Sequence, residues 1–207
     1  CLEWGRELLT LAGEDRALLA NNLGFGIGLA VQASILPAEA IDEAVDLHRL
    51  ALKLTPDTDS ARFIRVANLA SRISEAVSAG RLPQESLRES ADLHLLSLEA
   101  PLGDLDRPMF LLNRAVSLSE LADAGLCPES ARPESLTLIR EASAGRPRDG
   151  NDAMFWDTLG TMLGDAVRAG MGEPELLLEA IQAHAHAIAA TPVGHPYAAQ
   201  RHGNSAT

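Results

Sequence analysis

The sequence predicts an all-α fold, a right-handed α-solenoid of about four helical hairpins that each span 45 to 46 residues. Composition is the first indication, because 46% of the residues are hydrophobic and only 3% are aromatic, which favours helices packed closely through small residues. The second indication is that the chain aligns with itself at a shift of 45 to 46 residues, as helical repeats do. The third is apolar spacing of three and four residues, as in Ile64, Ala67, Leu69, Ile73 and Val77.

A recurring proline turn divides the predicted hairpins. It occurs as "ASILPAE" from residue 33, "AGRLPQE" from 79, "AGLCPES" from 124 and "AGMGEPE" from 169. Small residues followed by a proline end one helix and begin the next. Each repeat is therefore expected to be one long helix, a turn and one shorter helix.

Further matching segments place the helices between these turns. "NNLG", "ANLA", "LNRA" and "DTLG" fall in one register on the long helices, and "DLHRLALKLTP" matches "DLHLLSLEAP" on the short ones. We expect long helices near 15–33, 60–79, 106–124 and 152–169, and shorter ones near 38–54, 84–99, 134–144 and 175–190. Residues 1–12 are expected to be the remnant of an earlier short helix, and those after Pro196 the start of a truncated long one.

The repeat register predicts one domain over residues 1–207, with units at about 15–55, 60–101, 106–147 and 152–192. We expect this stretch to be an excerpt of a longer protein, because it opens on Cys1 and both ends carry apolar residues that await a neighbour. Self-association through these uncapped ends is also expected.

The recurring positions resemble the tetratricopeptide repeat (TPR). Its first helix carries Trp, Leu and Gly, which here are Trp156, Leu159 and Gly160. Its second helix carries Ala, an aromatic residue, Ala and Pro, and the chain offers four such sets: Ala44, His48, Ala51 and Pro56; Ser90, His94, Ser97 and Pro101; Ser135, Ile139, Ala142 and Pro147; Ala180, His184, Ala187 and Pro192. The units are longer than the family's repeat of about 34 residues, which predicts an elongated first helix. Extended units of this kind are similar to arrays ahead of bacterial caspase-like CHAT domains.

Net charge and targeting signals limit the kinds of partner. A formal net charge of −12 repels the phosphates of nucleic acids and an anionic membrane surface. Neither a signal segment nor a run of eighteen apolar residues is present, which makes the cytoplasm the default location. Two cysteines, Cys1 and Cys127, are too few for a disulfide framework.

Histidines of the last repeat raise the question of a metal site. His184 occupies the position of His48 and His94 in earlier repeats, which in the family holds a side chain packed between the two helices. His186 lies about 200° around the helix from His184, so the two are not placed to share an ion. We therefore expect no metal site, and His184 is interpreted as a structural residue.

Other motifs also have structural interpretations. "GFGIG" at 24–28 resembles a dinucleotide loop, but it lies inside a predicted helix with no strand before it. Gly24 is interpreted as a small residue that lets helices approach, whereas Gly26 and Gly28 weaken the helix. Cys127 replaces Leu36 and Leu82 at the turn and is expected to be a small buried hydrophobe. Trp156 is expected in the core, no cofactor is expected, and the chain is not expected to be an enzyme.

The resemblance to TPR proteins implies a concave surface lined by the first helix of each unit. The groove positions carried over are Asn21, Phe25, Ala67, Ser71, Leu112, Val116, Asp157 and Thr161, followed one turn later by Leu29, Glu75, Glu120 and Asp165. This groove is expected to be acidic and to prefer a basic or neutral segment.

Two functions follow from this interpretation, and a third remains open. The first is a protein-interaction scaffold that binds a partner peptide, or another domain of the same chain, in its groove. The alternative is a regulatory array that controls an attached effector such as a CHAT-like protease. A small helical enzyme acting through His184 or Cys127 is the third hypothesis.

Overall fold

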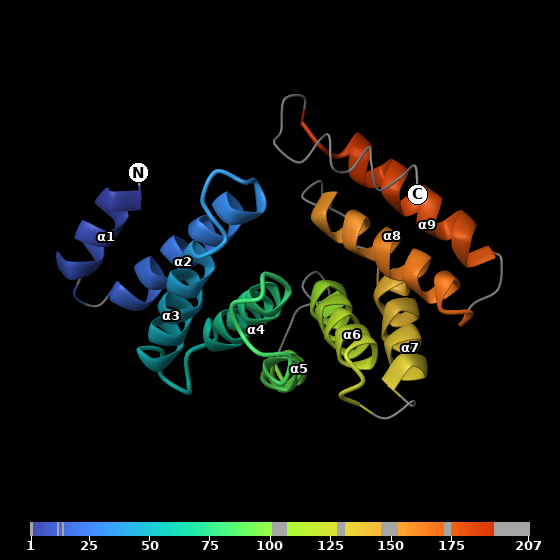
Figure 1. Ribbon diagram of the computed structural model, residues 1–207, viewed down its shortest axis with the longest axis horizontal. Helices are drawn as coiled ribbons and strands as arrows, with labels where there is room; N and C mark the ends of the chain where they lie inside the picture. Colours follow the sequence, from blue (N-terminus) through green and yellow to red (C-terminus); the bar gives the residue numbers. More distant parts are fainter. Residues whose placement is uncertain are drawn as a thin grey trace. The chain divides into compact units, whose positions relative to one another are not determined.

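The computed structural model describes residues 2–11, 13, 15–100, 107–127, 131–145, 153–171 and 175–192 (Figure 1). All regular structure in these residues is helical, as predicted, and no strand occurs among them. The helices are α1 (Leu2–Leu11), α2 (Arg16–Gln32), α3 (Ala40–Lys53), α4 (Arg62–Ser78), α5 (Ser86–Ser97), α6 (Arg107–Asp123), α7 (Ala131–Ala144), α8 (Ala153–Arg168) and α9 (Glu175–Ala189).

The alternation of long and short helices matches the predicted one closely. The largest difference is α7, which begins at Ala131 rather than at residue 134. The helix expected after Pro196 lies outside the described residues. No helix in the described ranges is both long and apolar enough to cross a membrane.

A left-handed residue ends the long helix of every hairpin. The backbone angle φ is 56° at Ser34, 68° at Gly80, 67° at Gly125 and 70° at Gly170. In each case the N–H of this residue donates to the carbonyl three residues earlier, and the next N–H donates to the carbonyl five residues earlier, over 2.7 to 3.1 Å. This Schellman geometry satisfies the last carbonyls of the helix, and glycine adopts it without steric cost. It is the physical basis of the recurring turn.

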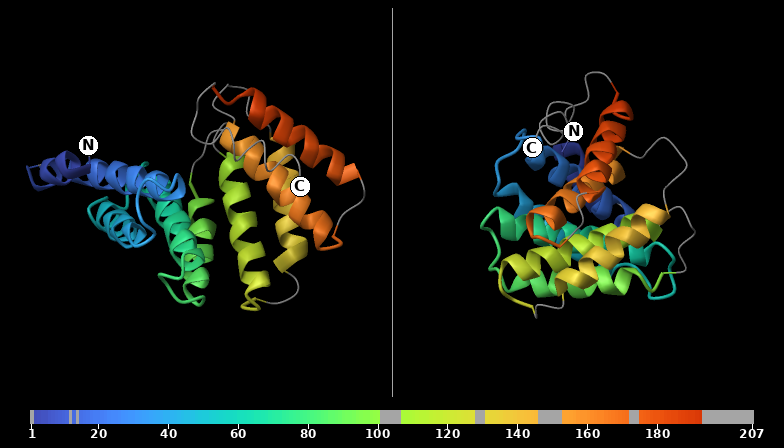
Figure 2. Two further views of the ribbon diagram at one scale, coloured as in Figure 1. Left: turned by 45° about the horizontal axis from the view of Figure 1, so that its top comes forward. Right: turned by 90° about the vertical axis from the view of Figure 1, so that its right-hand side faces the viewer.

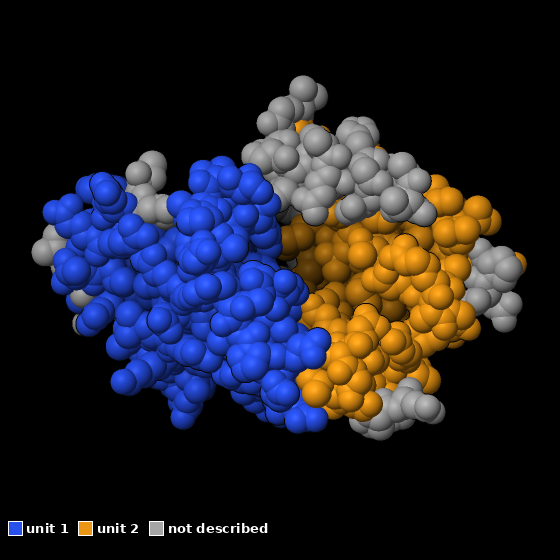
Figure 3. Space-filling view, in the orientation of Figure 1, with its two compact units in different colours: residues 1–100 blue, residues 101–207 orange. Residues whose placement is uncertain are grey.

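The chain forms two compact units, residues 1–100 and 101–207, which are coloured separately in Figure 3. The prediction of one continuous domain over 1–207 stays a prediction.

The first unit contains α1 to α5. α2 packs against α3, and α4 packs against both α3 and α5, while α1 lies against α2 (Figures 1 and 2). Ile27 of α2, Ile41 and Val45 of α3, and Leu69 and Ile73 of α4 belong to one buried cluster. Because this cluster draws on three helices, the two hairpins of the first unit share one core.

The second unit contains α6 to α9. α6 packs against α7, α8 packs against α9, and α8 also contacts α6 and α7 (Figure 2). Leu112 of α6, Ile139 of α7, and Leu159 and Leu163 of α8 are all fully buried. Consecutive helices are thus paired in both units, as expected of a helical repeat.

Within each hairpin, a small residue of the long helix lies at the level of a larger residue of the short one. A Cβ atom built on Gly24 would lie 3.0 Å from the ring of His48, and one on Gly160 would lie 2.8 Å from the ring of His184. Gly24 therefore has the predicted role of allowing close approach. In the two central hairpins the small residue is alanine, and Ser90 and Ser135 donate hydrogen bonds to the carbonyls of Ala70 (2.9 Å) and Ala115 (3.0 Å), respectively.

Two expectations about single residues need correction. Trp156 is half-buried rather than in the core, and its ring stacks on His186 with centroids 4.8 Å apart, whereas the adjacent Phe155 is buried. Gly28 does more than weaken α2, because a Cβ atom there would overlap the guanidinium of Arg72. Gly26 has open space around it.

Candidate functional site

The predicted groove residues lie on the long helices, α2 and α4 in the first unit and α6 and α8 in the second. Phe25 and Thr161 are exposed, and seven others are half-buried: Asn21, Ser71, Glu75, Val116, Glu120, Asp157 and Asp165. Leu29, one turn beyond Phe25, is also half-buried. Ala67 and Leu112 are only 5% and 0% exposed, so the structure corrects the expectation that they line an accessible surface. That the remaining residues form a groove stays a prediction.

Helical periodicity explains why Ala67 and Leu112 are buried. Each lies three residues before a small residue, Ala70 or Ala115, whose carbonyl accepts a hydrogen bond from the short helix of its own hairpin. Residues three apart share one face of an α-helix. Both side chains therefore lie on the face that packs inside the hairpin.

The carboxylate of Glu75 already has partners within the first unit. Arg72 forms an ion pair with it at 2.5 Å, and the side-chain amide of Gln32 donates to it over 2.7 Å. A second link between α2 and α4 is a 2.9 Å hydrogen bond from Asn68 to Asn21. These contacts hold the two long helices together, and they use the carboxylate expected to attract a basic peptide.

In the second unit, Asp157 and Asp165 also have cationic or titratable neighbours. Asp157 Oδ1 lies 3.3 Å from Nδ1 of His184 on the facing helix of the same hairpin. Asp165 forms an ion pair with Arg168. The negative charge available to a partner at Asp165 is thus smaller than the sequence predicted.

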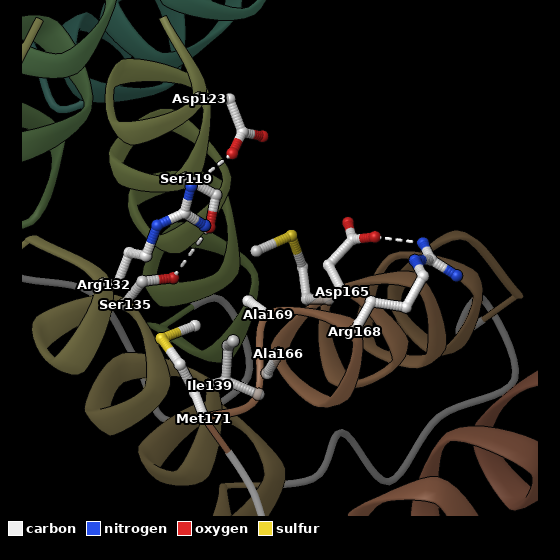
Figure 4. Close-up of a pocket in the computed structure, with 11 residues that line it drawn as sticks. Ser119, Asp123, Arg132, Ser135, Ile139, Asp165, Ala166, Arg168, Ala169 and Met171 are labelled. Carbon is white, nitrogen blue, oxygen red and sulfur yellow. Dashed lines mark hydrogen bonds and ion pairs between the residues drawn. The ribbon is translucent and has the colours of Figure 1, made fainter. Parts of the chain in front are cut away.

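A pocket of about 510 Å³ opens in the second unit, among α6, α7 and the end of α8 (Figure 4). Its size falls in the range of ligand pockets. The lining residues are Ser119, Asp123, Arg132, Ser135, Ile139, Met162, Asp165, Ala166, Arg168, Ala169 and Met171. Of the predicted groove residues, only Asp165 is among them.

Two ion pairs lie at this pocket, on different helices. Arg132 of α7 contacts Asp123 of α6 at 2.6 Å, and Asp165 pairs with Arg168 within α8 (Figure 4). Each pair is electrically neutral as a whole, yet it presents both donors and acceptors. The charged part of the lining therefore suits a polar, uncharged group such as a peptide backbone better than it suits a net charge.

The hydroxyl groups of Ser119 and Ser135 give the pocket an oriented hydrogen-bond acceptor. The Oγ atoms of Ser119 and Ser135 lie 3.2 Å apart, and Ser135 donates to the carbonyl of Ala115. A serine has only one hydroxyl proton, so Ser119 is the donor to Ser135. The free lone pairs of Ser119 can then accept a hydrogen bond from a ligand.

The rest of the pocket is apolar and adaptable. Ile139 and Ala166 are buried, while Met171 is half-buried; Met162 and Ala169 complete this part of the lining. Methionine side chains are flexible and polarizable, and they adjust to differently shaped apolar groups. The pocket can therefore hold an aliphatic side chain next to hydrogen-bonding groups.

A second pocket, of about 460 Å³, lies in the first unit where α3 ends and α4 begins. Arg62 is committed there, because it donates to the carbonyls of Leu52 and Thr55 and pairs with Asp57 at 3.1 Å. These bonds anchor the connection between the two hairpins, and we give this pocket a structural role.

The histidine and cysteine candidates have distinct surroundings. His184 is buried against α8, whereas His186 is exposed and contacts Trp156 and the carbonyl of Gln182. In the described part of the chain, no group of three or more His, Cys, Asp or Glu residues could hold a metal ion. Cys127 is a free thiol and is half-buried rather than buried as expected.

His48 has the most strongly perturbed environment of these residues. Its ring is 0% exposed, and neither ring nitrogen has a hydrogen-bond partner. Burial, with a smaller contribution from the positive charge of Arg72, lowers the pKa of His48 from 6.5 to about 4. The ring is therefore neutral at pH 7 and acts as a packing residue.

Comparison of the chain with protein-family models, curated proteins and solved structures finds no match. The pocket of the second unit is thus the candidate site on its own geometry. Sequence reasoning missed it because Asp123, Arg132 and Arg168 lie at helix ends, outside the family's groove positions. A signal was present in the sequence, since Asp165 and Arg168 are spaced to pair on one helix face.

Proposed function

We propose that the chain is a TPR-like helical repeat module, a right-handed α-solenoid that binds a segment of a partner protein. The recurring motifs and the regularly paired hairpins support the repeat. The pocket among α6, α7 and α8 is the observation that carries the binding function. The segment can belong to another protein or to another domain of the same polypeptide.

The chemistry of the pocket defines the preferred segment. An aliphatic side chain would lie against Met171, beside the buried Met162 and Ile139, and would add a modest apolar contribution to the hydrogen bonds. The backbone amides beside it would meet Ser119 and the two Arg–Asp pairs. Because those pairs are internally neutralised, a neutral segment fits better than the strongly basic one that the acidic composition alone suggests.

Peptide display on the immobilised chain, followed by calorimetric titration of the best peptide, tests this proposal. Arg132→Gln leaves Asp123 without its cation, and Met171→Ser removes part of the apolar lining. Each is expected to weaken binding about tenfold, which corresponds to about 1.4 kcal/mol. Salt should have little effect on affinity, because the pocket carries no excess charge.

Arg140→Gln is the matched control. Arg140 is on α7 with Arg132 and is exposed, but it does not line the pocket. Its replacement should leave affinity unchanged. Equal affinity of the wild-type chain, Arg132→Gln and Met171→Ser for every selected peptide would reject the pocket as the binding site.

A further inference from the structure

The pocket of the second unit has a counterpart position in the first, because each unit contains two consecutive hairpins. The repeat register aligns Gly24 of α2 with Ala115 of α6, and Ala70 of α4 with Gly160 of α8. In both units the second long helix contacts the first long helix and the short helix before it. The register therefore shows what the first unit places where the second unit has its pocket.

In the first unit the chain fills this position itself. Arg72 is only 5% exposed, and its guanidinium lies against Gly28, where a Cβ atom would overlap it. Arg72 pairs with Glu75 at 2.5 Å, and Gln32 of α2 donates its side-chain amide to the same carboxylate over 2.7 Å. Glu75 thus binds one cation from its own helix and one carboxamide from the other long helix.

In the second unit only the carboxylate of this group is kept, as Asp165. The other three positions change in size or charge: Gly28 to Ser119, Arg72 to Met162 and Gln32 to Asp123. A methionine side chain is shorter than that of arginine and has no N–H group. All four residues of the second unit line the pocket. The pocket is therefore the counterpart of the space that polar side chains fill in the first unit.

Asp165 already has a cation, because it pairs with Arg168 on its own helix. The amide donor of the first unit is the part that has no counterpart. Asp123 stands at the position of Gln32, carries no side-chain N–H group, and pairs with a residue of α7 rather than with α8. The position therefore suits a neutral amide from a ligand better than a further cation.

We propose that this pocket binds the side-chain carboxamide of a glutamine in the partner segment. The inference rests on the proposed function and deepens it, because it assigns one amide of the segment to a side chain. One N–H of the carboxamide would donate to Asp165, as Gln32 donates to Glu75. The other N–H would donate to the free lone pairs of Ser119, and the carbonyl would accept from the guanidinium of Arg132. Figure 4 shows Ser119 and Arg132 on one side of the pocket and Asp165 on the other.

A primary carboxamide suits this lining better than the related groups do. A backbone amide has a single N–H and cannot donate to both acceptors at once. A glutamate would add negative charge beside Asp165 and Asp123, and an arginine would add positive charge beside Arg132 and Arg168. The aliphatic stem of glutamine would lie against Met171, which lines the same pocket.

Defined peptides are the probes for this proposal. They are alanine pentapeptides, blocked at both ends, whose central residue is glutamine, glutamate or methionine. The full chain is titrated with each peptide and followed by NMR. We expect the glutamine peptide to shift the backbone signals of Ser119 and Asp165. The glutamate and methionine peptides should bind at least about tenfold more weakly, because neither has the side-chain N–H donors.

Asp123→Gln tests the comparison between the units directly. It supplies within the chain the carboxamide that Gln32 supplies in the first unit, so it should occupy Asp165 and weaken binding of the glutamine peptide about tenfold or more. Asp123→Asn loses the same charge, but its carboxamide is shorter by a methylene group, and it should weaken binding less. The side chain of Asp123 is 69% exposed, so both variants are expected to fold.

Glu179→Gln is the matched control. Glu179 is exposed on α9 and does not line the pocket, and its replacement also exchanges a carboxylate for a carboxamide. It should leave the affinity for the glutamine peptide unchanged. Equal affinity for the glutamine and methionine peptides, or full binding of the glutamine peptide by Asp123→Gln, overturns the proposal.

The result also separates this proposal from the proposed function. If the glutamine peptide fails to bind while selected peptides still depend on Arg132 and Met171, the glutamine assignment is wrong and the pocket remains the binding site for another group. If no selected peptide depends on those two residues, both proposals are wrong.

Discussion

The hairpins α2–α3 and α8–α9 share one packing device but differ in their electrostatics. In both, a glycine of the long helix lies against a histidine of the short one, Gly24 with His48 and Gly160 with His184. Around His48 the charged neighbour is the cation Arg72. Around His184 it is the carboxylate of Asp157, at 3.3 Å.

This difference shows what a repeat position determines. The position sets the size of the side chain that fits against the small residue, and therefore the packing. The charge around it comes from other positions, which vary between repeats. Four predictions test this distinction, in order of decreasing size.

The largest effect is expected in how the stability of the first hairpin depends on pH. The pKa of His48 is lowered by folding, so the unfolded chain takes up a proton first as the pH falls. Stability is then intact above pH 6.5 and is lost as the pH falls toward about 4, by about 3 kcal/mol at most. Hydrogen exchange of α2 and α3, compared between the wild-type chain and His48→Leu, measures this loss.

His48→Leu is also the control for other acid effects. The pKa values of Asp42 and Glu43 are lowered by hydrogen bonds from Arg81 and Arg6, so both carboxylates also lose stabilising contacts at low pH. These losses occur in both proteins and cancel in the comparison. An identical decline in the two proteins would show that His48 is not held neutral by the fold.

The second effect concerns the glycine–histidine contact of the last hairpin. Gly160→Ala places a methyl group 2.8 Å from the His184 ring and should cost about 1–3 kcal/mol, partly offset by the better helix propensity of alanine. The double variant Gly160→Ala/His184→Ile reproduces the Ala115 and Ile139 pair of the third hairpin. Urea denaturation should show that it recovers most of the loss. Additive single effects would mean that the two residues are not coupled.

The third prediction is that Gly26 and Gly28 of "GFGIG" respond in opposite ways to replacement by alanine. Gly26 has open space around it and lies inside α2, so Gly26→Ala should stabilise the first hairpin by up to about 1 kcal/mol. Gly28→Ala should destabilise it, because Arg72 must move away from Glu75 to make room. Thermal unfolding of the two variants should therefore shift in opposite directions.

The smallest effect is expected at the carboxylate beside His184. Asp157→Asn keeps the shape of the side chain and removes its charge. Because Asp157 is partly open to solvent, the free energy of unfolding at pH 7 should fall by about 0–1 kcal/mol. A loss of several kcal/mol in chemical denaturation would indicate that the pair, rather than packing, holds the last hairpin.

The fold followed from sequence more fully than the candidate site did. The turns at Gly80, Gly125 and Gly170 are local, since a small residue and a following proline act within a few positions, and so the helix ends were predicted closely. The accessibility of a side chain depends instead on which neighbour covers it. Leu112 and Ala67 were expected on an open surface and are buried, and Trp156 was expected in the core and is half-buried.

The pocket could not be derived from the repeat for the same reason. Its residues come from three helices, and three of them, Asp123, Arg132 and Arg168, lie at helix ends, where the family pattern makes no statement. The pairing of Asp123 with Arg132 joins the end of α6 to the start of α7. Spacing along one helix predicts pairs such as Asp165 and Arg168, but not contacts between helices.

The left-handed turns also bear on the relative stability of the hairpin turns. In all four hairpins the same length of chain separates the small residue of the long helix from the matching residue of the short helix, as between Gly24 and His48. The entropy of closing each loop is therefore the same. Differences in closure then come from the turn itself. Ser34 is the one non-glycine residue with positive φ in the described ranges, and this conformation costs a residue with a side chain about 1 kcal/mol or more. The turn of the first hairpin should therefore be less stable than a glycine turn by about that amount, and Ser34→Gly is expected to stabilise it.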